Sequence, residues 1–217
     1  MNKYGCEMSC PEMADSTVII VEDEMSVRES LETLLSAADY HYTSFASGEA
    51  FLGEPLPSIP RCLLLDLRLN GHDGLEVQDE LNARHAELPV LILSGADSVS
   101  SAVSAMKAGA MDFLQKPVQP ELLLSHIERA MKASVEARDR HASAEHDALL
   151  LARLTQREHE ILALLVEGNT NKDVARTLDI STRTVETHRM HLMEKLEART
   201  LADLVRVWFN GAAFHLL

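Results

Sequence analysis

Residues 17–23 read TVIIVED, five β-branched residues followed directly by two carboxylic acids. A continuous run of this kind is typical of a strand that is covered on both faces, as strands of parallel sheets are. Helical and strand patterns then alternate along the chain, which favours an α/β fold with a doubly wound, five-stranded parallel sheet. The expected strands are 17–21, 41–45, 61–65, 89–93 and 111–114, and the expected helices between them are 25–38, 48–52, 75–85 and 99–108.

A second segment follows the last of these strands. After Pro120 an apolar stripe of helical spacing runs through Leu123, Ile127 and Met131, and then thins out into a charged, alanine-rich stretch without Pro or Gly. The order of domains that we expect is a flexible tail (1–16), an α/β domain (17–133), a helical linker (134–150) and an all-α domain (151–217).

Charge is distributed unevenly along the 217 residues, whose net charge is −14. Residues 1–120 hold 19 acidic and 7 basic residues, a net charge of −12, whereas residues 155–217 hold 9 acidic and 8 basic residues. An acidic half repels polyanions, so any contact with nucleic acid must come from the second half. That half is close to neutral, so its affinity for DNA must depend on where the basic residues lie.

The composition excludes several other classes of protein. The apolar fraction is 46%, but no apolar run approaches the ~18 residues that a membrane span needs, and the first residues lack the apolar core of a secretion signal. The three cysteines, Cys6 and Cys10 in the tail and Cys62 in an apolar run, do not make a disulfide framework. We therefore expect a cytoplasmic protein with no membrane partner.

Polar side chains stand at the carboxyl ends of the predicted strands. Glu22 and Asp23 follow the first strand, Asp66 the third, Ser94 the fourth and Lys116 the fifth. These ends meet at one edge of a doubly wound sheet, and with the strand order 2-1-3-4-5 the first and third strands are neighbours. Each residue alone could be a cap or a solvated loop residue, but together the three carboxylates favour Mg²⁺ and equip the site to accept a phosphoryl group.

Four stretches resemble a two-component receiver domain, a flavodoxin-like fold, over residues 17–120. They are VIIVEDE (18–24), LLLDLRLNGHDGLE (63–76), PVLILSGAD (89–97) and AVSAMKAGAMDFLQKPV (102–118). Departures from the usual pattern are Glu at position 22 where Asp is commoner, and Asn70 where the loop usually has Pro.

The resemblance implies a role for each residue of this constellation. Asp66 is the expected phosphoacceptor, and a sensor histidine kinase is the expected donor. The expected ligands of Mg²⁺ (or Mn²⁺) are Glu22, Asp23, Asp66 and the main-chain carbonyl of Arg68. The residues expected to respond to the phosphoryl group are Ser94, Lys116 and Phe113.

The last segment has the pattern of a helix-turn-helix. Thr155 and Glu158 form a capping box at the start of a helix, and a short helix (171–178), a tight turn and a long helix (182–197) follow. On the long helix a wheel places Val185, Leu192 and Leu196 toward the core. His188 and Arg189 flank this core face. The opposite face either is simply solvated or reads base edges; it consists of Arg183, Glu186, Thr187, Met190 and Glu194.

Residues 155–200, TQREHEILALLVEGNTNKDVARTLDISTRTVETHRMHLMEKLEART, resemble a LuxR-type helix-turn-helix, and with the receiver the chain resembles a FixJ/NarL-type response regulator. This implies a phosphorylation-activated regulator that dimerises on double-stranded DNA, with the last predicted helix (201–209) as a dimer surface. The expected base-facing residues are Glu186, Thr187 and Met190. The expected phosphate or groove contacts are Lys172, Arg183, His188 and Arg189.

Two other functions fit the residues at the acidic site less well. A Mg²⁺-dependent aspartyl phosphatase would need a second Asp two residues after Asp66, where Arg68 stands, so we expect no turnover beyond self-phosphorylation and slow self-dephosphorylation. A regulator that works without phosphorylation would not need the intact acidic, Ser and Lys positions. His188 and His191 have the i, i+3 spacing of metal ligands, but the sequence offers no evident third ligand.

Overall fold

The computed structural model describes residues 16–55, 59, 61–70, 73–84, 86–95 and 99–214. Apart from Ser16, the predicted tail with Cys6 and Cys10 lies outside these ranges. Contacts between residues divide the chain into two compact units, Met1–Arg138 and Asp139–Leu217.

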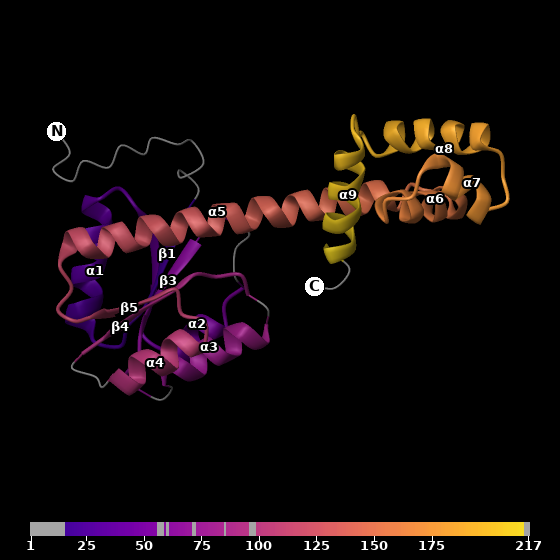
Figure 1. The fold of residues 1–217 in the computed structure, drawn as a ribbon. Coiled ribbons are helices and arrows are strands. Elements are labelled where there is room, and N and C mark those ends of the chain that lie inside the picture. The colour runs from indigo at the N-terminus through magenta and orange to yellow at the C-terminus, as the bar shows by residue number, and fades with distance from the viewer. Residues whose placement is uncertain are drawn as a thin grey trace. The chain divides into compact units, whose positions relative to one another are not determined.

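The first unit is built on a parallel sheet in the order β2-β1-β3-β4-β5, so the predicted strand order is confirmed. Figure 1 shows the sheet between two layers of helices. The strands are β1 (Thr17–Val21), β2 (His41–Phe45), β3 (Arg61–Asp66), β4 (Val90–Ser94) and β5 (Asp112–Gln115). The helices are α1 (Met25–Ala37), α2 (Gly48–Leu52), α3 (Gly74–Ala83), α4 (Val99–Lys107) and α5 (Pro120–Leu151).

Each face of the sheet is covered by a separate apolar cluster, because alternate residues of a strand point to opposite faces. Val18 and Ile20 pack with α1 and α5 on one face, whereas Ile19 and Val21 pack with α2, α3 and α4 on the other. The central strands β3 and β4 are buried nearly throughout, which explains their unbroken apolar sequences. Cys62 is a buried free thiol within this core.

The register of the strands brings their carboxyl ends to one edge. Val21 at the end of β1 pairs with Leu65, so Glu22 follows at the same level as Asp66. On the other side of β3, Asp66 pairs with Leu93, next to Ser94. The polar residues that follow the strands are thereby placed side by side.

The second unit is helical. Helix α5 is continuous from Pro120 to Leu151, so it includes the predicted linker. The other helices are α6 (Gln156–Val166), α7 (Asn171–Thr177), α8 (Thr182–Lys195) and α9 (Leu201–Phe214). Their shared core includes Ile161, Leu162 and Leu204 together with the predicted core face of α8, since Val185, Leu192 and Leu196 are buried.

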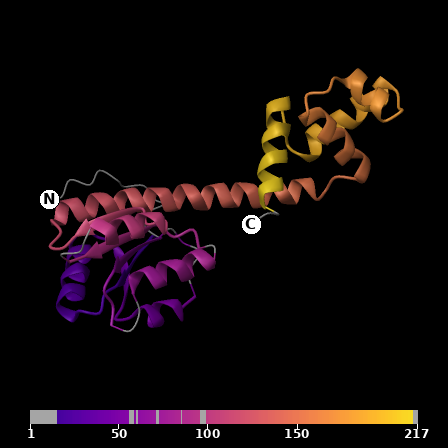
Figure 2. The same cartoon turned by 60° about the horizontal axis from the view of Figure 1, so that its bottom comes forward.

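Helix α9 continues five residues past its predicted end at Phe209. Glycine is disfavoured inside a helix, but Gly211 allows a close approach between helices. A Cβ on Gly211 would come within 2.6 Å of Leu151 Cδ1 and 3.0 Å of the Ala148 nitrogen. Figure 2 shows α9 crossing the end of α5 at this contact.

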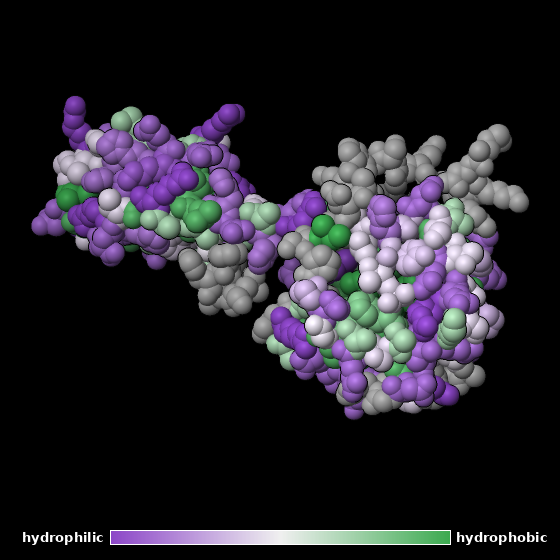
Figure 3. Space-filling model, turned by 180° about the vertical axis from the view of Figure 1, so that it is seen from behind, coloured by the Kyte–Doolittle hydropathy of each residue, from purple (hydrophilic) through white to green (hydrophobic). Residues whose placement is uncertain are grey.

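On the face drawn in Figure 3, hydrophilic side chains cover most of the second unit and the apolar ones occur in separate spots. Within the described ranges, no helix is both long and apolar enough to cross a membrane.

Candidate functional site

Three carboxylates meet at the carboxyl edge of the sheet. One oxygen each from Glu22, Asp23 and Asp66 lies within 4.8 Å of the others. Glu22 is 1% exposed and Asp66 8%, whereas Asp23 is half-buried. The sequence predicted this grouping because β1 and β3 are adjacent and parallel, and the structure brings all three residues together.

Lys116, which follows β5, holds two of these carboxylates. Its Nζ donates to Glu22 Oε2 at 2.5 Å and to Asp66 Oδ2 at 2.7 Å. Burial acts to lower the pKa of Lys116, but the hydrogen bonds and charges of the two carboxylates outweigh it and raise that pKa above its usual value. The ammonium group is therefore charged and neutralises part of the acidic cluster.

Burial raises the pKa of Glu22 to about 6, and the neighbouring Asp66 adds to this rise while Lys116 opposes it. A raised pKa means that the ionised carboxylate is poorly stabilised by its surroundings, so a bound cation would stabilise it. Within the part of the chain that the structure describes, this cluster holds three carboxylates and no thiol or imidazole, a set that suits a hard ion such as Mg²⁺. The residues present therefore fit the predicted metal.

Ser94 and Phe113 complete the predicted switch residues. Ser94 ends β4 and is fully buried, and its hydroxyl has no hydrogen-bond partner among the described residues. Its carbonyl oxygen accepts from the Lys116 backbone N–H at 2.6 Å, which places β4 beside the lysine. Phe113 on β5 is half-buried and packs against the apolar cluster beneath α4.

Loop contacts that the sequence did not predict fix the acidic residues in place. The backbone N–H of Arg68 donates to Asp66 Oδ1 at 3.0 Å, and Asn70 donates to Asp23 Oδ2 through its backbone and its side chain. Arg28 Nη1 on α1 donates to the Glu22 carbonyl at 2.7 Å. Asn70 thus holds Asp23 in place, although receiver domains usually carry Pro at the position of Asn70. No sequence pattern predicted the Arg28 contact.

Gly74, the first residue of α3, touches the backbone of the strand end. A Cβ at this position would lie 2.4 Å from the Asp66 carbonyl oxygen and 2.8 Å from the Leu67 Cα. Any larger residue would push α3 away from the loop that carries Asp66.

A second group of predicted site residues, the expected DNA contacts, lies on α7 and α8. Arg183, Glu186, Thr187 and Met190 are exposed, as the helical wheel predicted, and Met190 is 61% exposed. The border residues of that wheel, His188 and Arg189, are half-buried, and Lys172 on α7 is exposed.

Helix α7 is tied to α8 at this face, because Arg189 Nη1 donates to Asn171 Oδ1 at 3.3 Å. The Ser181 side chain accepts from the Thr184 N–H and caps α8. The short helix, turn and long helix therefore present one continuous polar face, the arrangement that enters a DNA major groove in helix-turn-helix proteins.

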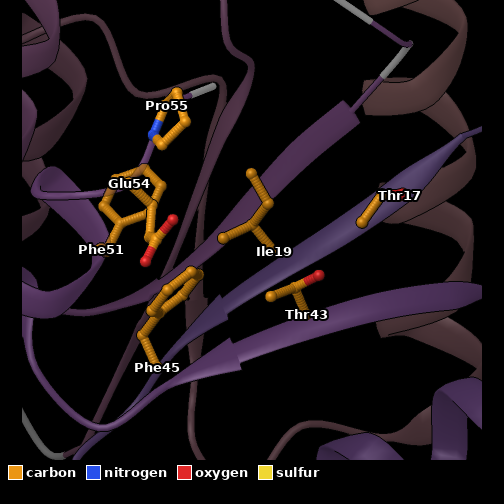
Figure 4. Close-up of a pocket in the computed structure, with 7 residues that line it drawn as sticks. All are labelled: Thr17, Ile19, Thr43, Phe45, Phe51, Glu54 and Pro55. Carbon is orange, nitrogen blue, oxygen red and sulfur yellow. The ribbon is translucent and has the colours of Figure 1, made fainter. Parts of the chain in front are cut away.

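A separate cavity of about 350 Å³ lies beside β1, β2 and α2 (Figure 4). Its lining contains none of the three clustered carboxylates and is mainly apolar, with two threonine hydroxyls and the Glu54 carboxylate. The residues around it are Thr17, Ile19, Thr43, Phe45, Phe51, Glu54 and Pro55.

Two families match successive parts of the chain. Residues 18–128 match the response regulator receiver domain, and residues 152–208 match the bacterial regulatory proteins of the luxR family.

Similar proteins cover most of the chain. It is 37% identical to the transcriptional regulatory protein FixJ of Bradyrhizobium diazoefficiens, over 88% of this chain and 93% of that protein. It is 36% identical to the transcriptional regulatory protein TdiR of Thauera aromatica, over 91% of this chain and 87% of that protein. Among solved structures, that of the response regulator StyR matches with a TM-score of 0.77 and 37% identity, over 89% of this chain and 98% of that one.

Proposed function

Because the chain belongs to the response regulators that join a receiver domain to a LuxR-type DNA-binding domain, and is a phosphorylation-dependent transcription regulator, we propose that Asp66 is its phosphoacceptor. The observation that carries this proposal is the position of Asp66. It ends the central strand β3, accepts a hydrogen bond from Lys116 Nζ at 2.7 Å, and has an oxygen within 4.8 Å of oxygens of Glu22 and Asp23.

The reaction is a transfer between two side chains. A carboxylate oxygen of Asp66 attacks the phosphorus of a phosphohistidine on the sensor kinase, the P–N bond breaks, and an acyl phosphate forms. Receiver domains generally bind Mg²⁺ at an acidic pocket. In this chain, Mg²⁺ or Mn²⁺ held by Glu22, Asp23, Asp66 and the Arg68 carbonyl would supply positive charge to the phosphoryl oxygens.

Lys116 and Ser94 respond to the new group. Lys116 already donates to Asp66, so its ammonium group can pair with a phosphoryl oxygen without a large movement. Among the described residues the Ser94 hydroxyl has no hydrogen-bond partner to give up, and it gains one by turning toward the phosphoryl group. Phe113 then packs further inward, and β4 and β5 transmit the change to α4 and α5.

Apolar residues on these elements support dimerisation as the output. Val103 and Met106 on α4 and Leu122 on α5 are between 46% and 48% exposed. On α9, Leu201 and Phe209 are 42% and 61% exposed, which supports a second dimer contact in the DNA-binding domain. When two joined copies bind adjacent half-sites of double-stranded DNA, the second contact is intramolecular, so the dimer binds more tightly than one copy.

We propose that the chain catalyses its own phosphorylation and its own slow dephosphorylation, and no further reaction. A phosphatase of this type would have a second Asp two residues after the acceptor, whereas Arg68 occupies that position and is exposed. We therefore expect no turnover of a generic phosphate ester.

Asp66→Asn tests the assignment of the acceptor. With radiolabelled acetyl phosphate and Mg²⁺, the wild type should take up label and Asp66→Asn should take up none. Asp79→Asn is the matched control, because Asp79 is an exposed acid on α3 outside the cluster. Stable labelling of the Asp66→Asn protein to the wild-type level would show that another residue is the acceptor.

A further inference from the structure

Helices α6 and α8 bring together three metal-ligating side chains outside the receiver. Glu158 lies on α6, and His188 and His191 lie on α8, which packs against it (Figure 1). One carboxylate oxygen and one nitrogen from each imidazole lie within 4.8 Å of one another. Glu158 is the third ligand that the sequence did not reveal, because it comes from another helix.

Glu158 is held in place with one oxygen left available. The residue is 4% exposed, and Oε2 accepts all of its described hydrogen bonds, from the Thr155 N–H at 2.8 Å, the Thr155 hydroxyl at 2.9 Å and Lys195 Nζ at 2.7 Å. Within the described ranges, no hydrogen bond ends on Oε1 or on either imidazole. The hydrogen bonds to Oε2 fix the carboxylate, so Oε1 is oriented for a ligand. Hydrogen bonds to metal-binding side chains have the same effect in known metal sites.

The charge state of the cluster also suits a cation. Burial alone would raise the pKa of Glu158, but the hydrogen bonds from Lys195 and Thr155 outweigh it and lower that pKa to about 2. The carboxylate is therefore ionised at neutral pH. Lys195 works against a second cation, but its ammonium group is bound to Oε2 rather than Oε1.

We propose that Glu158, His188 and His191 form a binding site for a divalent transition-metal ion of the Zn²⁺ class. Two imidazoles and one carboxylate are a set of protein ligands that Zn²⁺ accepts, with water at the fourth position. An ion held there would join α6 to α8. It would also occupy His188, which the sequence places among the predicted DNA contacts, and would add positive charge to a nearly neutral domain.

The test is Zn²⁺ titration by calorimetry on the full chain, produced without a histidine tag. Cys6→Ser and Cys10→Ser remove the tail thiols, and excess Mg²⁺ occupies the acidic cluster of the receiver. This parent protein should bind one Zn²⁺ per chain through the cluster. His191→Gln should weaken that binding about tenfold or more; its side chain is exposed, so the fold should be retained.

His146→Gln is the matched control, because His146 is an exposed histidine on α5 outside the cluster, and it should bind Zn²⁺ like the parent. A second readout is the rise in melting temperature on adding Zn²⁺, which His191→Gln and His188→Gln should reduce. Unchanged Zn²⁺ affinity in the His191→Gln protein, or no stoichiometric binding by the parent, would overturn the proposal.

Discussion

At the scale of single residues, the buried hydroxyl of Ser94 makes the resting receiver less stable than it could be. An unpaired buried polar group costs about 1–3 kcal/mol, and Ser94 Oγ has no partner among the described residues. Ser94→Ala should therefore leave the free energy of unfolding of the unphosphorylated protein unchanged or raise it, as measured by urea denaturation. The same variant should lose most of its response to phosphorylation.

The control for this prediction is Ser30→Ala on α1, whose hydroxyl already donates to the Ser26 carbonyl at 2.7 Å. It should respond to phosphorylation like the wild type. If Ser94→Ala destabilised the resting protein strongly, the hydroxyl would have a structural role rather than the switching role proposed for it.

Lys116 makes the opposite contribution to stability. Lys116→Met leaves the carboxylates of Glu22 and Asp66 together without their cation, and Glu22 is almost completely buried. The removal of one partner from a buried ion pair costs about 3 kcal/mol. Urea denaturation should show this loss, and added Mg²⁺ should stabilise Lys116→Met more than the wild type. Equal stability of the two proteins would contradict the neutralising role of Lys116.

The positions of Glu22, Asp66 and Ser94 could be predicted because each stands at the end of an unbroken apolar strand, and that of Lys116 because it follows the short fifth strand. What the sequence could not predict are contacts made by long or loop side chains across the fold. Asn70 reaches Asp23 only because the loop after β3 folds back toward β1. Glu158 lies near His188 only because α6 packs on α8. The spacing of residues in the sequence does not predict which helices pack together.

At the scale of elements, the start of α6 depends on Glu158. This residue closes the capping box with Thr155 and also accepts from Lys195 at the end of α8. Glu158→Gln removes the charge from these hydrogen bonds and should lower the free energy of unfolding of the second unit by about 1.5 kcal/mol at neutral pH. Chemical denaturation in the presence of a chelator measures this difference, and Glu194→Gln, an exposed acid on α8, is the control.

The difference between wild type and Glu158→Gln should also depend on pH in a defined direction. Glu158 titrates at about 2 when folded and at its ordinary 4.5 when unfolded. The charged carboxylate therefore contributes its full stabilisation above pH 4.5 and loses it as the pH falls toward 2. A stability difference that stayed constant from pH 6 to pH 2 would contradict this assignment.

Element boundaries were harder to predict than the elements themselves. Helix α3 begins at Gly74 rather than Leu75 because Asp73 forms a capping box with Glu76. Strand β5 is shifted by one residue, since its pairing with β4 begins at Asp112. Helix α9 passes through Gly211 because that glycine packs against α5 instead of ending the helix. In each case a contact with another residue outweighs the local sequence preference.

At the scale of the whole molecule, the two domains carry very different charges. The acidic receiver repels DNA, and the nearly neutral second domain gains little from the release of counterions. Phosphorylation adds more negative charge, so it can favour DNA binding only through conformation and dimerisation. Phosphorylation at Asp66 and occupancy of DNA must therefore be linked.

The most direct test of this linkage is the affinity of the full chain for its operator, identified by selection from random duplexes. It should be measured with and without acetyl phosphate in the presence of Mg²⁺. Phosphorylation should raise the affinity of the wild type by about 5–150-fold, the usual range of coupling between two sites, and should leave that of Asp66→Asn unchanged. An affinity of the wild type that stays the same after stoichiometric phosphorylation would contradict the account.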